Sequence, residues 1–183
     1  TVGLRNGVSG ETTCDHEKLL KVGIKGYMEE CREHIRSTIS TGKEDQEKID
    51  YWTACIIQCE GLITYAHRMA EEAERQAAAC SDEKRKKELL TIAENCRVVP
   101  ENPPRTFQQA LQMIWFAHVY FQIEVCTTAC GFGRFDQYMW PYYKKDVIDE
   151  KNITQDEALE MLECFYLKAC EVYEVRDKWY ATS

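Results

Sequence analysis

Apolar residues recur at intervals of three and four positions through most of this chain, which is the spacing of one face of an α-helix. The longest uninterrupted pattern covers residues 44–79, and a helix of that length extends about 50 Å at 1.5 Å per residue. Its apolar positions are Ile49, Trp52, Ile56, Cys59, Ile63, Ala66, Ala70 and Ala73. Because they shrink to alanine towards the C-terminal end, the pattern predicts a bracing helix that closely contacts a neighbouring helix there.

Shorter helical patterns lie on both sides of the long one. Asp15 suits the N-cap of a helix over residues 15–40, and Ser81 suits that of a helix over residues 81–97. Gly23 and Gly26 fall inside the first pattern, where each costs about 1 kcal/mol relative to alanine. In a packed helix, however, glycine permits close approach by a neighbour. The preceding residues, 1–13, are rich in glycine and irregular.

The stretch 105–143 combines a buried helix with an aperiodic segment. Thr106 and Gln109 form a capping-box pair at its start. The helix that follows is apolar on most sides, which predicts that it is covered by the rest of the protein. Residues 125–133 then show no helical period and carry cysteines, threonines and glycines. A rigid helix that delivers a polar loop is a common support for a small-molecule site.

Two further helices are predicted beyond this loop. The first covers residues 134–149, with Pro141 either in its first turn or at a kink. The second follows a capping box formed by Thr154 and Glu157. No segment shows the clean alternation of a strand, and no internal repeat is present. The pattern therefore predicts a mainly α chain.

Composition excludes several classes of function. The hydrophobic fraction of 44% belongs to a globular protein rather than a disordered one. A net charge of −8 argues against nucleic-acid binding, since the basic run 84–87 is flanked by acidic residues and suits a solvated helix face. No apolar run approaches the roughly 18 residues of a membrane span. These features predict a cytoplasmic protein with no nucleic-acid or membrane partner.

The ten cysteines lie mostly inside helical patterns and contain no C-x-x-C pair. This distribution is typical of reduced thiols and not of a small secreted disulfide scaffold. Two pairs, Cys31 with His34 and Cys14 with His16, have spacings that occur in metal sites. A zinc site needs about four ligands, and no second compact pair accompanies either one. The sequence therefore predicts no metal.

Several motifs occur together in one order. They are GETTCDHEKLLKVGIKGYMEE, VPENPPRTFQQALQMIWFAH, QIE, GRFDQYMWPYYKKDV, ITQDEALEMLECFYLK and EVRD. In this order the chain resembles the pyruvate formate-lyase-like glycyl radical enzymes, in their glycerol and diol dehydratase branch, over nearly its whole length. All of residues 1–183 would then belong to part of one such domain, with 1–13 as a pocket loop.

The resemblance implies a ten-stranded α/β barrel in the full-length enzyme. It also implies a glycyl radical, installed by a radical SAM activating enzyme, that oxidises a cysteine to the thiyl that abstracts a substrate hydrogen. The family's R-V-x-G-Y glycine loop and G-C-x-E cysteine turn do not occur here, and the similar string 21–27 lies in a helical pattern. The chain is therefore expected to be an N-terminal to middle segment, inactive by itself, of an anaerobic homodimer.

The resemblance also points to residues that select the substrate. Gly10-Glu11 stands where glycerol and diol dehydratases carry Gly-His, and Thr128-Ala129 stands where they carry His-Ser. These differences argue against glycerol or propane-1,2-diol as substrate. Glu11 is expected to accept a hydrogen bond from a hydroxyl, to pair with a cation, or to act as a base, against the alternative of a solvent-exposed loop glutamate.

The other polar residues of this region have simpler interpretations. Cys126 and Cys130 are expected to pack as small hydrophobes, with a pocket role as the alternative. The Gly-x-Gly before Arg134 is expected to form a tight turn, and Arg134 to pair with a carboxylate such as Asp136. His118 lies on an apolar face and is expected to be a core histidine.

Two functions fit the sequence. The first is a segment of a glycyl radical lyase or dehydratase, which forms part of the wall of a cavity for a small organic substrate and meets the remainder of the enzyme chain. Catalytic residues are expected elsewhere in that enzyme. The alternative is a stand-alone helical scaffold or protein-binding module, whose seam at residues 49–73 contacts a partner.

Overall fold

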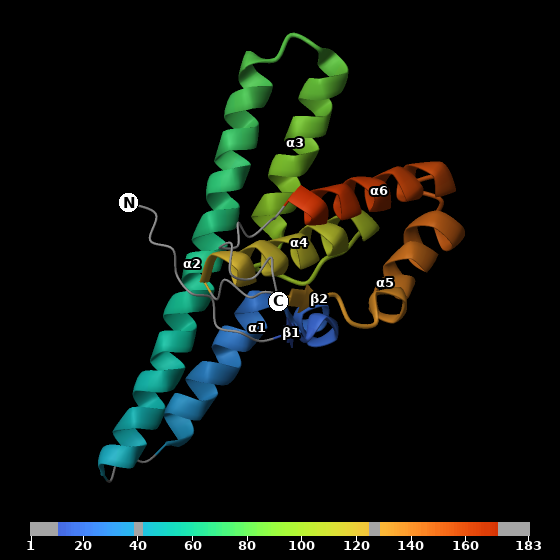
Figure 1. The fold of residues 1–183 in the computed structure, drawn as a ribbon. Coiled ribbons are helices and arrows are strands. Elements are labelled where there is room, and N and C mark those ends of the chain that lie inside the picture. The colour runs from blue at the N-terminus through green and yellow to red at the C-terminus, as the bar shows by residue number, and fades with distance from the viewer. Residues whose placement is uncertain (1–10, 39–41, 125–128, 172–183) are drawn as a thin grey trace, which may run out of the picture. The chain divides into compact units, whose positions relative to one another are not determined.

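A computed structural model describes residues 11–38, 42–124 and 129–171 of the chain (Figure 1). The chain divides into two compact units. The helical unit consists of Asp15–Phe116, and the strand-bearing unit consists of Thr1–Cys14 with Ala117–Ser183. The described residues are mainly helical, as the periodicity predicts. No described helix is both long and apolar enough to cross a membrane.

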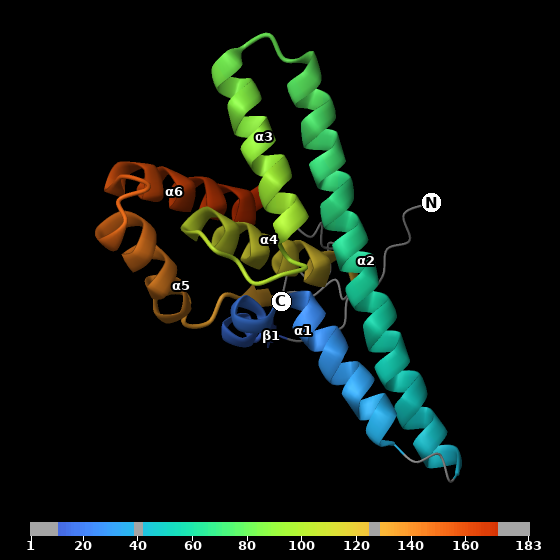
Figure 2. The ribbon, with the colours of Figure 1, turned by 180° about the vertical axis from the view of Figure 1, so that it is seen from behind.

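The helical unit is built around α2 (Lys43–Ala79). The N-terminal half of this helix packs beside α1 (His16–Ser37), and its C-terminal half packs beside α3 (Glu83–Val98) (Figures 1 and 2). Ala66 and Ala70 have no exposed surface, and Ala73 and Ala77 are also buried. The predicted close contact at the alanine end of the seam is therefore confirmed. Because the chain's own helices lie along the seam, its exposure to a partner is not favoured.

The helix α4 (Phe107–Glu124) begins in the helical unit and ends in the strand-bearing unit. Its capping box forms as predicted, since the Gln109 N–H donates to Thr106 Oγ1 at 3.1 Å. The Gln109 side chain reaches back one residue further than expected, and accepts from the Arg105 N–H at 2.9 Å. Every residue from 107 to 118 is buried or half-buried, which confirms the prediction of a helix covered on most sides.

The first predicted helix is interrupted at Gly23, which has φ 67° and ψ 175°. At this kink the Ile24 N–H donates to the Pro100 carbonyl at 2.9 Å, and the Lys25 N–H donates to the Glu101 carbonyl at 3.0 Å. The chain thus begins a second helical segment after Gly23, and carbonyl groups of a distant segment accept the hydrogen bonds of its first free N–H groups. A Cβ at Gly23 would lie 2.8 Å from the Glu101 carbonyl oxygen. Gly23 therefore permits a close approach by a neighbouring segment, as the sequence suggested. The helix predicted over residues 15–40 is, however, not continuous.

The Glu101 side chain joins α1 and α2 at the same place. Its carboxylate lies 2.8 Å from Lys25 Nζ and 3.1 Å from His67 Nε2. The hydrogen bond from Lys25 is the main cause that lowers the pKa of Glu101, with a smaller contribution from His67. The carboxylate is only 20% exposed, so solvent screens it less than it screens the carboxylates of most other ion pairs of these helices.

Replacing Glu101 with glutamine is expected to lower the free energy of unfolding by about 1 kcal/mol at neutral pH. A carboxyl whose pKa is lowered by folding stabilises the protein above its unfolded-state pKa, and that contribution is lost as pH falls through the folded-state pKa. Urea unfolding of both proteins from pH 7 to pH 3 should therefore show the difference shrinking with acid. Glu88→Gln, which removes an exposed pair with Arg85, should stay within about 0.5 kcal/mol. A Glu101 effect that is constant over this range would contradict the account.

The strand-bearing unit contains β1 (Glu11–Thr13), β2 (Ala129–Gly131), α5 (Phe135–Tyr143), the π-helix η1 (Lys144–Asp149) and α6 (Gln155–Glu171). Pro141 lies inside α5 and not in its first turn. The helix continues beyond it with π-type bonding, in which the Glu150 N–H donates to the Lys145 carbonyl at 2.8 Å. The capping box of α6 forms as predicted, with the Thr154 N–H donating to Glu157 at 2.7 Å.

Candidate functional site

The two strands pair in parallel, and this pairing is the centre of the candidate site. Its backbone register sets Glu11 opposite Ala129, Thr12 opposite Cys130 and Thr13 opposite Gly131. Two positions that the resemblance selected are thus direct neighbours across the sheet. The third, Thr128, lies outside the described residues. The sequence pattern did not reveal these strands, because three-residue strands are too short to show alternation and form only through a distant partner.

Thr13 packs across the turn that follows β2. A Cβ atom added to Gly131 would lie 3.2 Å from Thr13 Oγ1. A Cβ atom added to Gly133 would lie 3.3 Å from Thr13 Cγ2. Gly133 also has φ 61°, which favours glycine. The two glycines therefore let β1 approach the turn, which confirms that they serve a tight turn.

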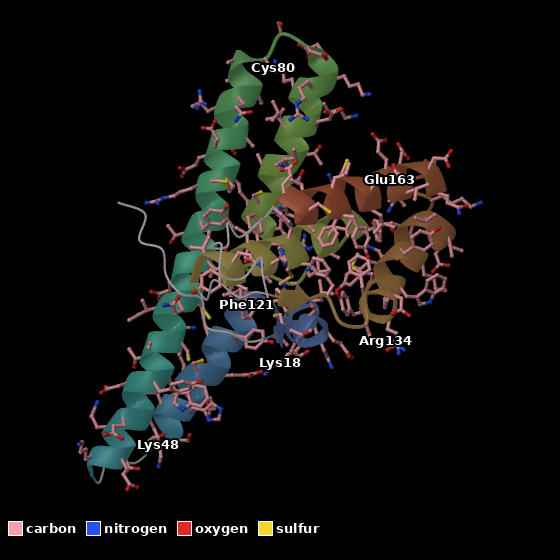
Figure 3. All side chains as sticks on the ribbon, in the orientation of Figure 1. Lys18, Lys48, Cys80, Phe121, Arg134 and Glu163 are labelled. Carbon is pink, nitrogen blue, oxygen red and sulfur yellow. The ribbon has the colours of Figure 1, made fainter. Side chains whose placement is uncertain are left out.

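Arg134 is the N-cap residue of α5, and its side chain is exposed (Figure 3). Its guanidinium pairs with Asp136 through two contacts of 3.3 Å, as the sequence predicts. This pair lowers the pKa of Asp136, mainly through the hydrogen bond from Arg134. With both side chains about 70% exposed, the pair adds little stability, and its role is local.

An aromatic cluster supports the turn between β2 and α5. The Tyr138 hydroxyl donates to the Phe132 carbonyl at 2.6 Å, and burial raises the pKa of Tyr138. The Phe132 ring lies 5.1 Å from the ring of His118 and 5.0 Å from that of Phe165. The turn is thereby fastened to α4, α5 and α6 at once. Sequence reasoning missed Tyr138, whose only signal is its place six residues beyond a phenylalanine set between two glycines.

Burial favours the neutral forms of His118 and Cys130 in this region. His118 is 6% exposed, and burial lowers its pKa, which confirms it as a core histidine. Burial also raises the pKa of the half-buried Cys130, so this thiol stays protonated at neutral pH. Cys126 lies outside the described residues. Within the described ranges, no three His, Cys, Asp or Glu side chains are grouped so that they could hold a metal ion.

This arrangement can fix a loop in place. Parallel pairing holds residues 11 and 129 in register, while the glycines and the aromatic cluster restrain the turn that follows. Such restraint suits groups that recognise a ligand, because a binding group is most selective when its support is rigid.

Comparison with known proteins identifies the family of this chain. The model of the pyruvate formate lyase-like family matches residues 4–183. The chain belongs to this family. The resemblance expected from the motifs is therefore confirmed, together with the likeness to glycyl radical diol and glycerol dehydratases.

Relatives in the pyruvate formate lyase-like family carry out several reactions. An isethionate sulfite-lyase of Oleidesulfovibrio alaskensis is 43% identical over 84% of this chain and 19% of its own length. An indoleacetate decarboxylase of Tractidigestivibacter scatoligenes is 35% identical over 98% of this chain and 20% of its own. The glycerol-bound B12-independent glycerol dehydratase of Clostridium butyricum has a TM-score of 0.89 at 35% identity, over 95% of this chain and 22% of that one. The chain thus spans about a fifth of the length of the relatives it matches.

Proposed function

We propose that this chain forms one wall of the substrate cavity of a glycyl radical lyase that acts on a small organic molecule. The observation that carries the proposal is the register of β1 and β2, which sets Glu11 beside Ala129 in a family of radical lyases and dehydratases. Residues recruited from distant parts of a chain to one rigid edge commonly line a binding site.

In this proposal the substrate differs from glycerol and propane-1,2-diol. Glu11 replaces a histidine, and Thr128-Ala129 replaces His-Ser, at the positions given by the family resemblance. Glu11 would offer a carboxylate to a hydroxyl or an ammonium group of the substrate, and Thr128 would keep one hydroxyl. The relatives named above are a sulfite-lyase, a decarboxylase and a dehydratase. These residues are therefore proposed to select the substrate and not to determine which of its bonds is broken.

The remaining chemistry is proposed to come from residues outside this sequence. The full-length enzyme would adopt a ten-stranded α/β barrel, assemble as a cytoplasmic homodimer and be activated by a radical SAM enzyme. Its glycyl radical would supply, through a cysteine, the hydrogen abstraction. The residues of this chain would bind and orient the substrate and keep water away from the cavity. By itself the chain is expected to have no turnover.

Hydrogen exchange tests whether the strand pair meets the substrate. The full-length protein, kept unactivated so that no turnover occurs, is mixed with candidate alcohols, amines and acids, and binding is measured by calorimetry. For a compound that binds, exchange at residues 11–13 and 129–131 is expected to slow about tenfold, which corresponds to about 1.4 kcal/mol of local stabilisation. The hairpin of α2 and α3 serves as the internal control and should exchange unchanged. A bound substrate that protects neither strand would contradict the proposal.

A further inference from the structure

The turn that follows β2 is held at its middle residue by Tyr138, which lies on α5. Gly131 and Gly133 are exposed, whereas Phe132 between them is half-buried. The backbone carbonyl of Phe132 accepts a hydrogen bond from the Tyr138 hydroxyl at 2.6 Å, which is short even for an O–H···O hydrogen bond. Because Phe132 and Tyr138 are both half-buried, water competes for this bond less than it does at the surface. The backbone of the turn is therefore tied to α5.

Aromatic rings hold Tyr138 itself in place. Its ring lies 5.7 Å from the ring of Phe135, and the Phe135 ring lies 5.6 Å from that of Phe165 on α6. Phe165 is buried, and its ring lies 5.0 Å from the ring of Phe132, which brings the series of contacts back to the turn. The hydroxyl of Tyr138 is thus presented by a packed support. Such support is what a group needs if it is to fix the position of a binding segment.

Burial also keeps Tyr138 a hydrogen-bond donor. It raises the pKa of the phenol, which therefore stays neutral at and above neutral pH. A neutral phenol donates to a carbonyl oxygen, whereas a phenolate can only accept. The tie between α5 and the turn is therefore expected to hold over the whole neutral range of pH.

The position of the turn sets the position of β2. Gly131 is the last residue of β2 and directly precedes Phe132. It pairs with Thr13 in the same register that sets Ala129 opposite Glu11. A pair of strands is marginally stable by itself and depends on packing against other elements. A shift of the backbone at Phe132 is therefore expected to displace β2, and position 129 with it.

We propose that Tyr138 is a positioning residue of the substrate site, whose hydroxyl holds the end of β2 where the cavity wall fits the substrate. This inference rests on the function proposed above, and it adds a residue that acts through the turn. Without the hydrogen bond, the turn adopts further arrangements, and the apparent affinity falls with the fraction of molecules that keep the correct one. Because the substrate and the transition state lose the same support, KM rises while kcat is kept.

Tyr138→Phe in the full-length enzyme tests the inference, because it removes the hydroxyl and keeps the ring. In the unactivated protein without ligand, amide exchange at residues 129–131 is expected to become about tenfold faster. In the activated enzyme, with the compound that binds most tightly in the calorimetric screen, KM is expected to rise about tenfold, which corresponds to about 1.4 kcal/mol, and kcat to stay within twofold. Tyr166→Phe is the matched control. Its ring lies 6.0 Å from that of Phe135 and is about half exposed, and both measurements should match the wild type.

The outcomes separate this inference from the function on which it rests. Unchanged exchange at residues 129–131 in Tyr138→Phe overturns the inference whatever the ligand. A lower kcat at unchanged KM also overturns it, because that result shows a loss of folded enzyme and not of substrate fit. If substrate protects both strands of the wild type while KM is unchanged in Tyr138→Phe, the inference fails and the proposed function stands. If substrate protects neither strand of the wild type, both fail.

Discussion

Replacing Gly23 with alanine is expected to lower the free energy of unfolding by about 3 kcal/mol. The backbone at φ 67° and ψ 175° belongs to a region that is essentially restricted to glycine, and another residue there costs about 1–3 kcal/mol. The added Cβ would also lie 2.8 Å from the Glu101 carbonyl oxygen and 2.8 Å from the Asn102 carbonyl carbon. Both are backbone atoms, so relief requires the segment to move and the hydrogen bonds at Ile24 and Lys25 to lengthen.

Gly61→Ala is the matched control for this substitution. Gly61 lies inside α2, and a Cβ there would meet no atom within 4 Å. Alanine at this position should raise the free energy of unfolding by about 0.5–1 kcal/mol, because it favours the helix more than glycine does. Urea midpoints of the two variants should therefore move in opposite directions. A Gly23→Ala protein as stable as the wild type would show that the kink is not a fixed part of the fold.

The sequence was sufficient for features that depend on neighbours in the chain. The helices follow from apolar spacing, and the caps at Thr106 and Thr154 follow from residues three positions apart. The close contact at the alanine end of α2 follows from side-chain size. The pairing of Arg134 with Asp136 needs only two residues of separation. In each case a local pattern contains most of the physical information.

Features that depend on contacts between distant segments could not be predicted from the sequence. The glycine at position 23 was recognisable, but its partner, the backbone at Glu101 and Asn102, was not, and so the kink was missed. The strands β1 and β2 have three residues each and exist only through each other. The resemblance named Glu11 and Ala129 separately, whereas their adjacency is a property of the fold. Thr13 and Tyr138, which restrain the same turn, lie within quoted motifs, but those motifs did not assign them a role.

Glu11→Gln in the full-length, activated enzyme tests the central claim that Glu11 recognises the substrate. Loss of a hydrogen bond to a charged group costs about 1.5–3 kcal/mol, so kcat/KM is expected to fall about 30-fold. The amide keeps the shape of the side chain, and the yield of glycyl radical, measured by electron paramagnetic resonance, is expected to match the wild type. Glu163→Gln, an exposed change on α6 (Figure 3), controls for the loss of one negative charge and should leave kcat/KM unchanged. The account predicts a fall with Glu11→Gln alone; a kcat/KM within twofold of the wild type, at equal radical yield, would contradict it.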